Sequence, residues 1–256
     1  MKARVRYDKR GKIRFLSHRD LARVWERALR RAGIRVAYSE GFSPRPKLSF
    51  GLALSTGYES LGEYLDVDVH PEAGVTPEEL PTLVSPHLPP GMTAQAAMPL
   101  EPGTDSLQAA VTSSTWQLEV LGPDVAELRR GVEVALAAST LPLTVERKGS
   151  EVEVDARPGI VALTPLDDLD PADLPADDLR AATTTGPLLV AELATQPRSL
   201  RPAELLRALD PAWREGRVLR TNQWTNVDGA RCEPIPLGDP GARAATSPTH
   251  AGARAS

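Results

Sequence analysis

Residues 1–38 read MKARVRYDKRGKIRFLSHRDLARVWERALRRAGIRVAY, and their pattern decides the fold class of the first half of the chain. Apolar and polar residues alternate over 3–7, as they do in a strand with one buried face. Ser17 is a favoured helix N-cap residue, and apolar residues then recur at helical spacing over 21–32. A second extended segment is expected over 34–38. The stretch therefore predicts the order strand, helix, strand.

The sequence that follows continues this alternation of strands and helices. Two strands are expected over 48–54 and 63–69. A helix is expected from Thr76 to near Leu88, with a proline at its first position. A last strand is expected over 92–98. The order strand, helix, strands, helix, strand is that of a ferredoxin-like βαββαβ unit.

A similar order of elements recurs in the second half, although the two halves share no repeated sequence. The expected elements are a strand over 115–121, a helix over 125–138, a hairpin over 143–146 and 151–155, strands over 160–163 and 188–193, a helix over 201–209 and a strand over 217–224. We therefore expect an α+β protein made of tandem ferredoxin-like (βαββαβ) domains with a disordered C-terminal tail.

This interpretation divides the chain into four parts. Residues 1–100 are expected to form a basic N-terminal ferredoxin-like domain, and 115–226 a C-terminal one. Residues 101–114 are the expected linker. From 227 to 256 the chain is rich in Gly, Pro, Ala, Ser and Thr. Such a composition buries too little apolar surface to fold, so we predict that this tail is disordered.

Charge is distributed unevenly along the chain. Residues 1–50 hold 15 Lys and Arg against 4 Asp and Glu, a net charge of +11, whereas the whole chain carries −4. Residues 51–256 therefore carry −15. Such a division predicts a basic face that binds a polyanion or an acidic partner. The alternative is that the basic and acidic parts pack together and neutralise each other.

The composition excludes several classes of protein. Cys232 is the single cysteine, which excludes an internal disulfide and a cysteine-based metal cluster. The N-terminus has no apolar segment typical of a secretory signal. No run approaches the roughly 20 apolar residues that cross a bilayer. We therefore expect a cytoplasmic protein without membrane association.

The first predicted helix carries a face of arginines opposite its apolar stripe. At roughly 100° per residue, Arg19, Arg23, Arg27 and Arg30 fall on that face, and Arg31 continues the i, i+4 row. Only two carboxylates lie on the same helix. An arginine-rich face suits phosphate or carboxylate, which the planar guanidinium binds with two parallel hydrogen bonds. The alternative is a solvated surface that binds nothing.

Ser17 and His18 stand at the expected start of this helix, just after Arg14. Free backbone N–H groups and the helix dipole attract phosphate at such a position. His18 can also act as a general acid or base near neutral pH. The alternative is that His18 is an ordinary residue of the first turn.

The segment Gly41–Lys47 reads GFSPRPK and cannot be helical, because each proline disfavours the helical conformation of the residue before it. Its prolines stiffen an extended backbone that presents Arg45 and Lys47 at low entropic cost. Phe42 can stack on a base, or it can pack into the core of a rigid turn.

Motifs for metal or cofactor chemistry are missing from the sequence. The histidines His18, His70, His87 and His250 are scattered, with no HxxxH pair. There is no GxGxxG, Walker or GxSxG motif. Aromatic residues make up only 4%, and the aromatic motif of RNA-recognition domains is absent. We expect no metal and no cofactor, and contact with a nucleic-acid backbone rather than readout of several bases.

Four stretches carry a resemblance to a known family: RFLSHRDL at Arg14–Leu21, RALRRAG at Arg27–Gly33, SEGFSPRPKLSF at Ser39–Phe50 and DARP at Asp155–Pro158. They closely resemble the radical SAM-associated family of bacterial proteins, a domain family of uncharacterised function. The resemblance implies a radical SAM enzyme as partner and a role linked to RNA. The CxxxCxxC motif of such an enzyme is missing, so this chain would be the accessory member.

Three functions are compatible with these observations. The leading hypothesis is an accessory RNA-binding protein, for tRNA or rRNA, that works with a radical SAM enzyme and has no catalytic activity by itself. The second is an RNA-processing or RNA-modifying enzyme that uses His18. The third is a protein-interaction module that docks on the radical SAM partner without nucleic acid. The candidate anion-binding residues are Arg14, Ser17, His18, Arg19, Arg23, Arg27, Arg30, Arg31, Gly41, Phe42, Ser43, Arg45 and Lys47.

Overall fold

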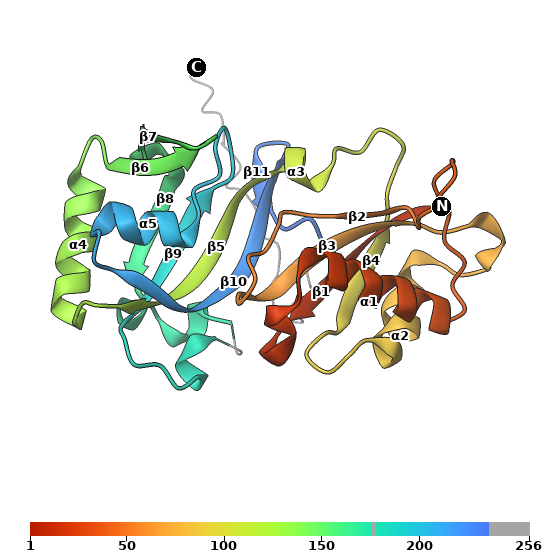
Figure 1. Ribbon diagram of the computed structural model, residues 1–256. Helices are drawn as coiled ribbons and strands as arrows, with labels where there is room; N and C mark the ends of the chain where they lie inside the picture. The colour runs from red at the N-terminus through yellow and green to blue at the C-terminus, as the bar shows by residue number, and fades with distance from the viewer. Residues whose placement is uncertain (176–177, 236–256) are drawn as a thin grey trace, which may run out of the picture.

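The computed structural model describes residues 1–175 and 178–235 as a mixed α+β protein with one large sheet and few helices (Figure 1). The strands are β1 (Lys2–Lys9), β2 (Leu48–Phe50), β3 (Glu59–Asp68), β4 (Ala94–Pro99), β5 (Val111–Leu121), β6 (Pro142–Arg147), β7 (Ser150–Asp155), β8 (Ile160–Pro165), β9 (Leu188–Ala194), β10 (Arg214–Val227) and β11 (Ala230–Cys232).

The helices are short and lie between these strands. The α-helices are α1 (His18–Arg31), α2 (Leu80–Val84), α3 (Leu107–Ala110), α4 (Val125–Ala137) and α5 (Pro202–Leu209). The 3-10 helices are η1 (Gly11–Phe15), η2 (Pro71–Ala73), η3 (Pro77–Glu79), η4 (Ser85–His87), η5 (Arg157–Gly159), η6 (Leu166–Asp168), η7 (Pro171–Asp173) and η8 (Leu179–Ala181).

Nine strands form one sheet, in the order β4-β1-β3-β10-β5-β9-β8, with β2 paired to β3 and β11 paired to β10. The strands of the first half are all antiparallel, and so are those of the second half. The two halves join where β10 runs parallel to β3, with Leu219 opposite Glu59 and Arg220 opposite Ser60. In Figure 1 the helices α1 and α2 lie with the first half, and α4 and α5 with the second.

Helix α1 forms where its sequence predicts it. The Ser17 hydroxyl accepts a hydrogen bond from the Asp20 N–H at 3.2 Å and caps the helix. The helix ends at Arg31 with Ala32 as its C-cap, and Gly33 follows with a φ of +73° that favours glycine. The apolar stripe is buried against β1, where Trp25 packs edge-to-face on Tyr7. These predictions are confirmed.

Strand β1 forms as predicted, but both of its faces are buried. One face packs in the same core as α1. The other carries Arg4 and Arg6, which are only 5% and 4% exposed. Arg4 Nε donates to Asp66 at 2.7 Å, and Arg6 Nη1 donates to Glu233 at 2.6 Å. Ion pairs from distant parts of the chain therefore cover a face that the alternating pattern predicted to be in water.

The strand predicted over 34–38 is wrong. This segment makes only isolated bridges, from Val36 to Val69 and from Tyr38 to Pro46. Pro46 has no N–H group with which to extend the ladder, which accounts for its interruption. The strand predicted over 48–54 is likewise reduced to β2.

The helix predicted from Thr76 to Leu88 is broken into three pieces. Thr76 begins it with a capping box to Glu79, as the sequence suggested. Pro81 and Pro86 then interrupt the hydrogen-bond pattern because they lack N–H groups, so the chain passes through η3, α2 and η4.

The segments predicted as linker and tail contain regular structure. Residues 107–110 form α3, and β5 begins at Val111 rather than at residue 115. Within the predicted tail, β11 pairs with the end of β10. Residues 236–256, the rest of that predicted tail, lie outside the described residues.

The apolar residues gather in two main clusters, one for each half. The first joins β1, α1, β3, α2 and β4, and the second joins β5, α4, β9, α5 and β10. Both apolar and polar contacts join the two halves: Tyr58, which precedes β3, packs edge-to-face on Trp116 of β5. Arg220 of β10 holds Glu63 of β3, and Tyr58 donates a hydrogen bond to Glu215. The halves are therefore joined by specific buried hydrogen bonds as well as by the shared sheet.

Glu119 of β5 is a hydrogen-bond acceptor for three backbone N–H groups from two segments. It accepts from the N–H groups of Thr185 at 2.7 Å, Arg217 at 2.8 Å and Gly186 at 3.4 Å. Burial raises the pKa of this carboxyl, but these hydrogen bonds outweigh burial and hold the pKa below its ordinary value. Because the pKa of Glu119 is lower in the folded protein, its carboxylate stabilises the fold at pH values above the ordinary carboxyl pKa. This stabilisation is lost as the pH falls through the pKa of the folded protein.

We expect Glu119→Gln to lower the free energy of unfolding by about 1–3 kcal/mol at pH 7, because an amide N–H then faces backbone donors. The difference from the parent protein should shrink as the pH falls below roughly 4, since a protonated carboxyl resembles the amide. Urea unfolding at both pH values measures this. Glu133→Gln, at an exposed position of α4, is the control. Equal losses at both pH values would contradict the prediction.

Candidate nucleic-acid interface

The arginine row of α1 comprises Arg19, Arg23, Arg27, Arg30 and Arg31, and all five are exposed. Arg23 pairs with Asp20 at 3.3 Å across half-exposed side chains. Arg27 Nε donates to the Arg23 carbonyl at 3.2 Å. Within the described part of the chain, the other members of the row form no ion pair. The row therefore presents guanidinium groups that are available to an anionic ligand.

The start of α1 is already occupied by a carboxylate. Ser17 Oγ donates to Asp20 Oδ2 at 2.7 Å, in addition to accepting the Asp20 N–H. The hydrogen bond from Ser17, together with the nearby Arg23 and Arg19, holds the pKa of Asp20 below its ordinary value. This negative charge sits where a phosphate was expected to bind. The contribution of the α1 N-terminus to anion binding is thereby reduced.

His18 is exposed and packs its ring edge-to-face on Phe50, with the ring centroids 5.0 Å apart. The two rings line a hollow of about 600 Å³ that also reaches Lys2 and Asp66. Within the described residues, His18 has no hydrogen-bonded acid, base or nucleophile. The geometry thus provides a ring contact for His18 and no catalytic pair.

Arg14 belongs to a different group of charges from the arginine row. It lies 3.9 Å from Glu59, which also binds Arg217 at 2.5 Å and the Gly11 N–H at 2.7 Å. Burial raises the pKa of Glu59, but these positive partners and hydrogen bonds outweigh it and lower the pKa. The Arg14 guanidinium also stacks 4.6 Å from the exposed ring of Phe15.

The 39–47 loop is closed at its base and open at its tip. Ser39 N–H donates to the Arg45 carbonyl at 2.8 Å, and Arg45 N–H donates back to Ser39 Oγ at 3.0 Å. Gly41, Ser43, Arg45 and Lys47 are exposed, and Phe42 is fully exposed at the tip. The alternative in which Phe42 packs into the core is therefore wrong.

The loop lies beside the C-terminal end of α1 and far from its start. Arg30, Tyr38 and Pro46 line one groove of about 490 Å³. Arg35 in the same groove pairs with Glu72 at 3.3 Å, so the groove contains both positive and negative side chains. Since the 14 residues of α1 span about 20 Å, Ser17 and His18 lie at the other end. The predicted residues thus form an extended surface rather than a single cleft.

Two exposed aromatic residues near α1 were not predicted from the sequence, and several basic residues do not reach the surface. The exposed aromatic rings of Phe15 and Tyr38 flank the two ends of α1. Conversely, Arg4, Arg6 and Lys9 are buried, so they add nothing to a basic face. The neutralisation alternative therefore holds for β1 and fails for α1. The two buried arginines of β1 each pair with a carboxylate distant in sequence, Arg4 with Asp66 and Arg6 with Glu233.

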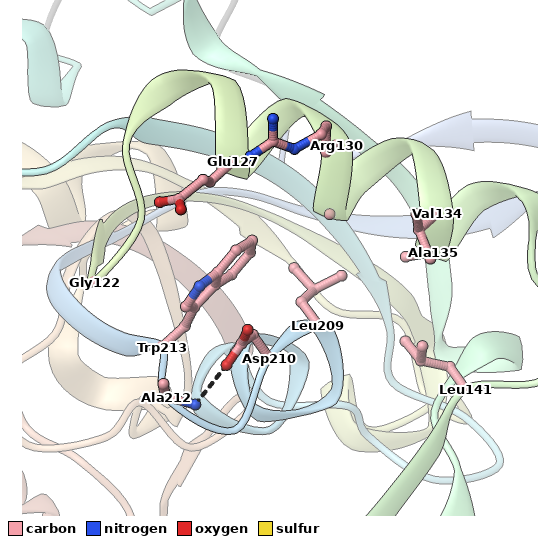
Figure 2. Close-up of a pocket in the computed structure, with 11 residues that line it drawn as sticks. Gly122, Glu127, Arg130, Val134, Ala135, Leu141, Leu209, Asp210, Ala212 and Trp213 are labelled. Carbon is pink, nitrogen blue, oxygen red and sulfur yellow. Dashed lines mark hydrogen bonds between the residues drawn. The ribbon is translucent and has the colours of Figure 1, made fainter.

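A further hollow of about 540 Å³ lies between α4 and the turn before β10. Figure 2 shows Glu127 and Arg130 above the Trp213 ring, and Asp210 accepting a hydrogen bond from the Ala212 N–H. The Trp213 ring packs directly on the α4 backbone at Gly131, where a Cβ would lie 2.5 Å from it. The residue at position 131 is therefore a glycine because the Trp213 indole leaves no room for a Cβ.

Two further structural features bear on the class of site. None of the helices in the described ranges has the length and apolar character that a membrane crossing requires. Among the same residues, no three His, Cys, Asp or Glu side chains are grouped as metal ligands.

The fold and surface define a mixed α+β protein with an exposed arginine helix. Its sequence matches a bacterial family over residues 2–202. The chain belongs to this family, described as uncharacterized protein conserved in bacteria (DUF2344). No curated protein matches the sequence significantly.

Proposed function

We propose that this protein is an accessory RNA-binding protein of the cytoplasm that binds tRNA or rRNA. The observation that carries the proposal is the arginine row of α1, five exposed guanidinium groups of which only Arg23 forms an ion pair within the described residues. Planar guanidinium groups bind phosphate with paired hydrogen bonds, and their spacing along one helix face suits successive phosphates. Such binding reads the RNA backbone and its shape.

The exposed aromatic rings extend the proposal to unpaired bases. Phe42 is fully exposed at the loop tip, and Phe15 beside the start of α1 is 59% exposed with Arg14 stacked on its ring. Aromatic rings next to arginines stack on bases that have left a helix. The proposed target is therefore a structured RNA with an unpaired loop or end.

A radical SAM enzyme is the proposed protein partner. The support is the resemblance of the segments at Arg14–Leu21, Arg27–Gly33 and Ser39–Phe50 to the radical SAM-associated family. With Cys232 as its single cysteine, the chain lacks the three thiolates of a CxxxCxxC cluster site. In this arrangement the partner carries the cluster and the reaction, and this protein presents the RNA.

The proposed architecture is a pair of ferredoxin-like units. The support is the strand order, which is β4-β1-β3-β2 in the first half and β10-β5-β9-β8 in the second half. If the strands of each half are numbered along the chain, both halves have the order 4-1-3-2 expected of a βαββαβ unit. The β6–β7 hairpin is then an insertion after α4.

We expect the double change Arg23→Glu plus Arg45→Glu to weaken tRNA binding by at least tenfold at low salt. Each reversal replaces a phosphate contact with repulsion, and about 1.4 kcal/mol corresponds to tenfold. Filter binding or fluorescence anisotropy with bulk tRNA and an rRNA fragment measures this. The control Arg130→Glu plus Arg207→Glu makes the same charge change at exposed positions of α4 and α5. Equal effects of both pairs, or no RNA binding by the parent protein, would sink the proposal.

The same preparations distinguish the two other functions. RNA cleavage or modification that disappears in His18→Ala would identify an enzyme. A complex with the radical SAM partner that survives nuclease treatment, without RNA affinity in the isolated protein, would identify a protein-interaction module.

A further inference from the structure

A hollow of about 400 Å³ lies where the two halves of the protein meet, and we call it the junction hollow. Its walls come from the segment after β2, from β5 and β10, and from the start of α5. Leu54, Tyr58, Ser114, Trp116, Leu200 and Arg201 are among its lining residues. Pockets of this size at a junction of structural units are common sites for small ligands.

Ser114 places an unpartnered hydroxyl in this hollow. The residue is 1% exposed, and its Oγ has no hydrogen-bond partner within the described residues. Because side chains alternate along a strand, Ser114 lies on the same face of β5 as Trp116. A buried hydroxyl without a partner costs about 1–3 kcal/mol, so its position beside a hollow indicates a ligand group that completes it.

Arg201 places an available positive charge at the rim. It is exposed and forms no ion pair within the described part of the chain. The other arginine of the hollow, Arg220, is 1% exposed and is fully engaged by Glu63 and the Leu52 carbonyl. Arg201 is therefore the cation that an incoming anion can reach.

The remaining groups of the hollow are neutral or apolar. Tyr58 donates to Glu215 at 2.5 Å, and burial together with this hydrogen bond raises the pKa of its phenol. Leu54 and Leu200 add apolar wall. One accessible cation, one buried hydroxyl without a partner and apolar walls suit a small ligand with an apolar body and a single anionic group.

The junction hollow lies next to the hollow at His18. Leu52 and Ala53 line both the junction hollow and the hollow at His18. The Gly57 N–H, in the same segment, donates to the Arg14 carbonyl at 2.8 Å. The start of α1 therefore lies close to one wall of the junction hollow.

We propose that the junction hollow binds one nucleotide that has left its stack, with its phosphate at Arg201 and its base or ribose hydrogen-bonded to Ser114. This inference rests on the proposed RNA-binding function and names the part of the RNA that the protein selects. Bases that are unpaired or at strand ends cost least to extrude, so loops and ends are preferred. The hollow of Figure 2 has no comparable group, because no unpartnered buried polar atom lines it among the described residues.

The test is titration of the full chain with adenosine, cytidine, guanosine and uridine 5′-monophosphates, followed by calorimetry or by NMR chemical shifts. At least one should bind. We expect Ser114→Ala to weaken it about fivefold to tenfold, and Arg201→Ala about tenfold to hundredfold, with partial recovery in Arg201→Lys. Because its hydroxyl has no partner among the described residues, Ser114→Ala should not lower the melting temperature.

Ser113→Ala is the matched control. Ser113 is the neighbour of Ser114 on the opposite face of β5, and its Oγ donates to Glu192 at 2.6 Å. Its replacement should lower the melting temperature and leave mononucleotide affinity unchanged. Arg130→Ala, at the rim of the other hollow, should also leave that affinity unchanged.

The outcomes separate this inference from the proposed function. If no mononucleotide binds, or if Ser114→Ala and Ser113→Ala bind equally well, the junction hollow is not a nucleotide site, and RNA binding by α1 stands on its own test. If mononucleotides bind but RNA does not, the hollow is a site for free nucleotides. The inference that it selects a nucleotide of an RNA is then overturned together with the proposed function. Loss of affinity for RNA loops but not for duplex RNA in Ser114→Ala would support both.

Discussion

Replacing Arg220 with alanine is expected to lower the free energy of unfolding by about 3–5 kcal/mol. Arg220 is 1% exposed, and its Nη2 donates to both carboxylate oxygens of Glu63 at 2.6 and 2.7 Å and to the Leu52 carbonyl at 3.0 Å. Its removal leaves the Glu63 carboxylate buried without its partner. Because the pair joins β10 to β3, the loss falls on the junction of the two halves.

Chemical denaturation of three variants measures this effect. Arg220→Met combined with Glu63→Leu removes both charges and should recover most of the loss, since a buried ion pair can be replaced by apolar side chains of similar volume. Arg35→Ala removes an arginine from a pair that is 70% and 72% exposed, and should cost no more than about 1 kcal/mol. An Arg220→Ala protein as stable as Arg35→Ala would contradict the argument.

The affinity for single-stranded RNA is expected to fall roughly hundredfold between 50 and 200 mM salt. Each phosphate neutralised on a single strand contributes about −0.7 to the slope of log affinity against log salt. If the five arginines of the row each neutralise one phosphate, the slope is about −3.5. A fourfold increase in salt then gives the hundredfold loss.

The variant Arg23→Ala plus Arg27→Ala should reduce that slope by about 1.4, because two phosphate contacts are removed. Arg130→Ala plus Arg207→Ala removes the same charge from α4 and α5 and should leave the slope unchanged. Affinity measured by anisotropy over a series of salt concentrations gives both slopes. A slope near zero for the parent protein would show that α1 does not bind through phosphate contacts.

The arginine row and the buried arginines of β1 have the same side chain and different roles. Arg4 and Arg6 are paired with Asp66 and Glu233, and both are buried. Hydrogen-bonded ion pairs of this kind orient strands, and they contribute little to the field outside the protein. The net charge of +11 over residues 1–50 therefore overstates the charge that a ligand meets.

The sequence by itself determined α1 and its exposed face. Ser17, the apolar stripe and Gly33 act within one helix through contacts three or four residues apart, so their pattern is sufficient to predict start, buried face and end. The same spacing placed the arginines opposite the stripe. The order of strands and helices along much of the chain also follows from such local patterns.

Only the tertiary structure decided which charges are buried, where Phe42 lies and where the two halves meet. Arg6 pairs with a residue 227 positions away, and Arg220 with one 157 positions away. No local pattern encodes such a partner, because it depends on which strands become neighbours in the sheet. The junction hollow arises in the same way: Ser114, Tyr58 and Arg201 come together because β10 pairs with both β3 and β5.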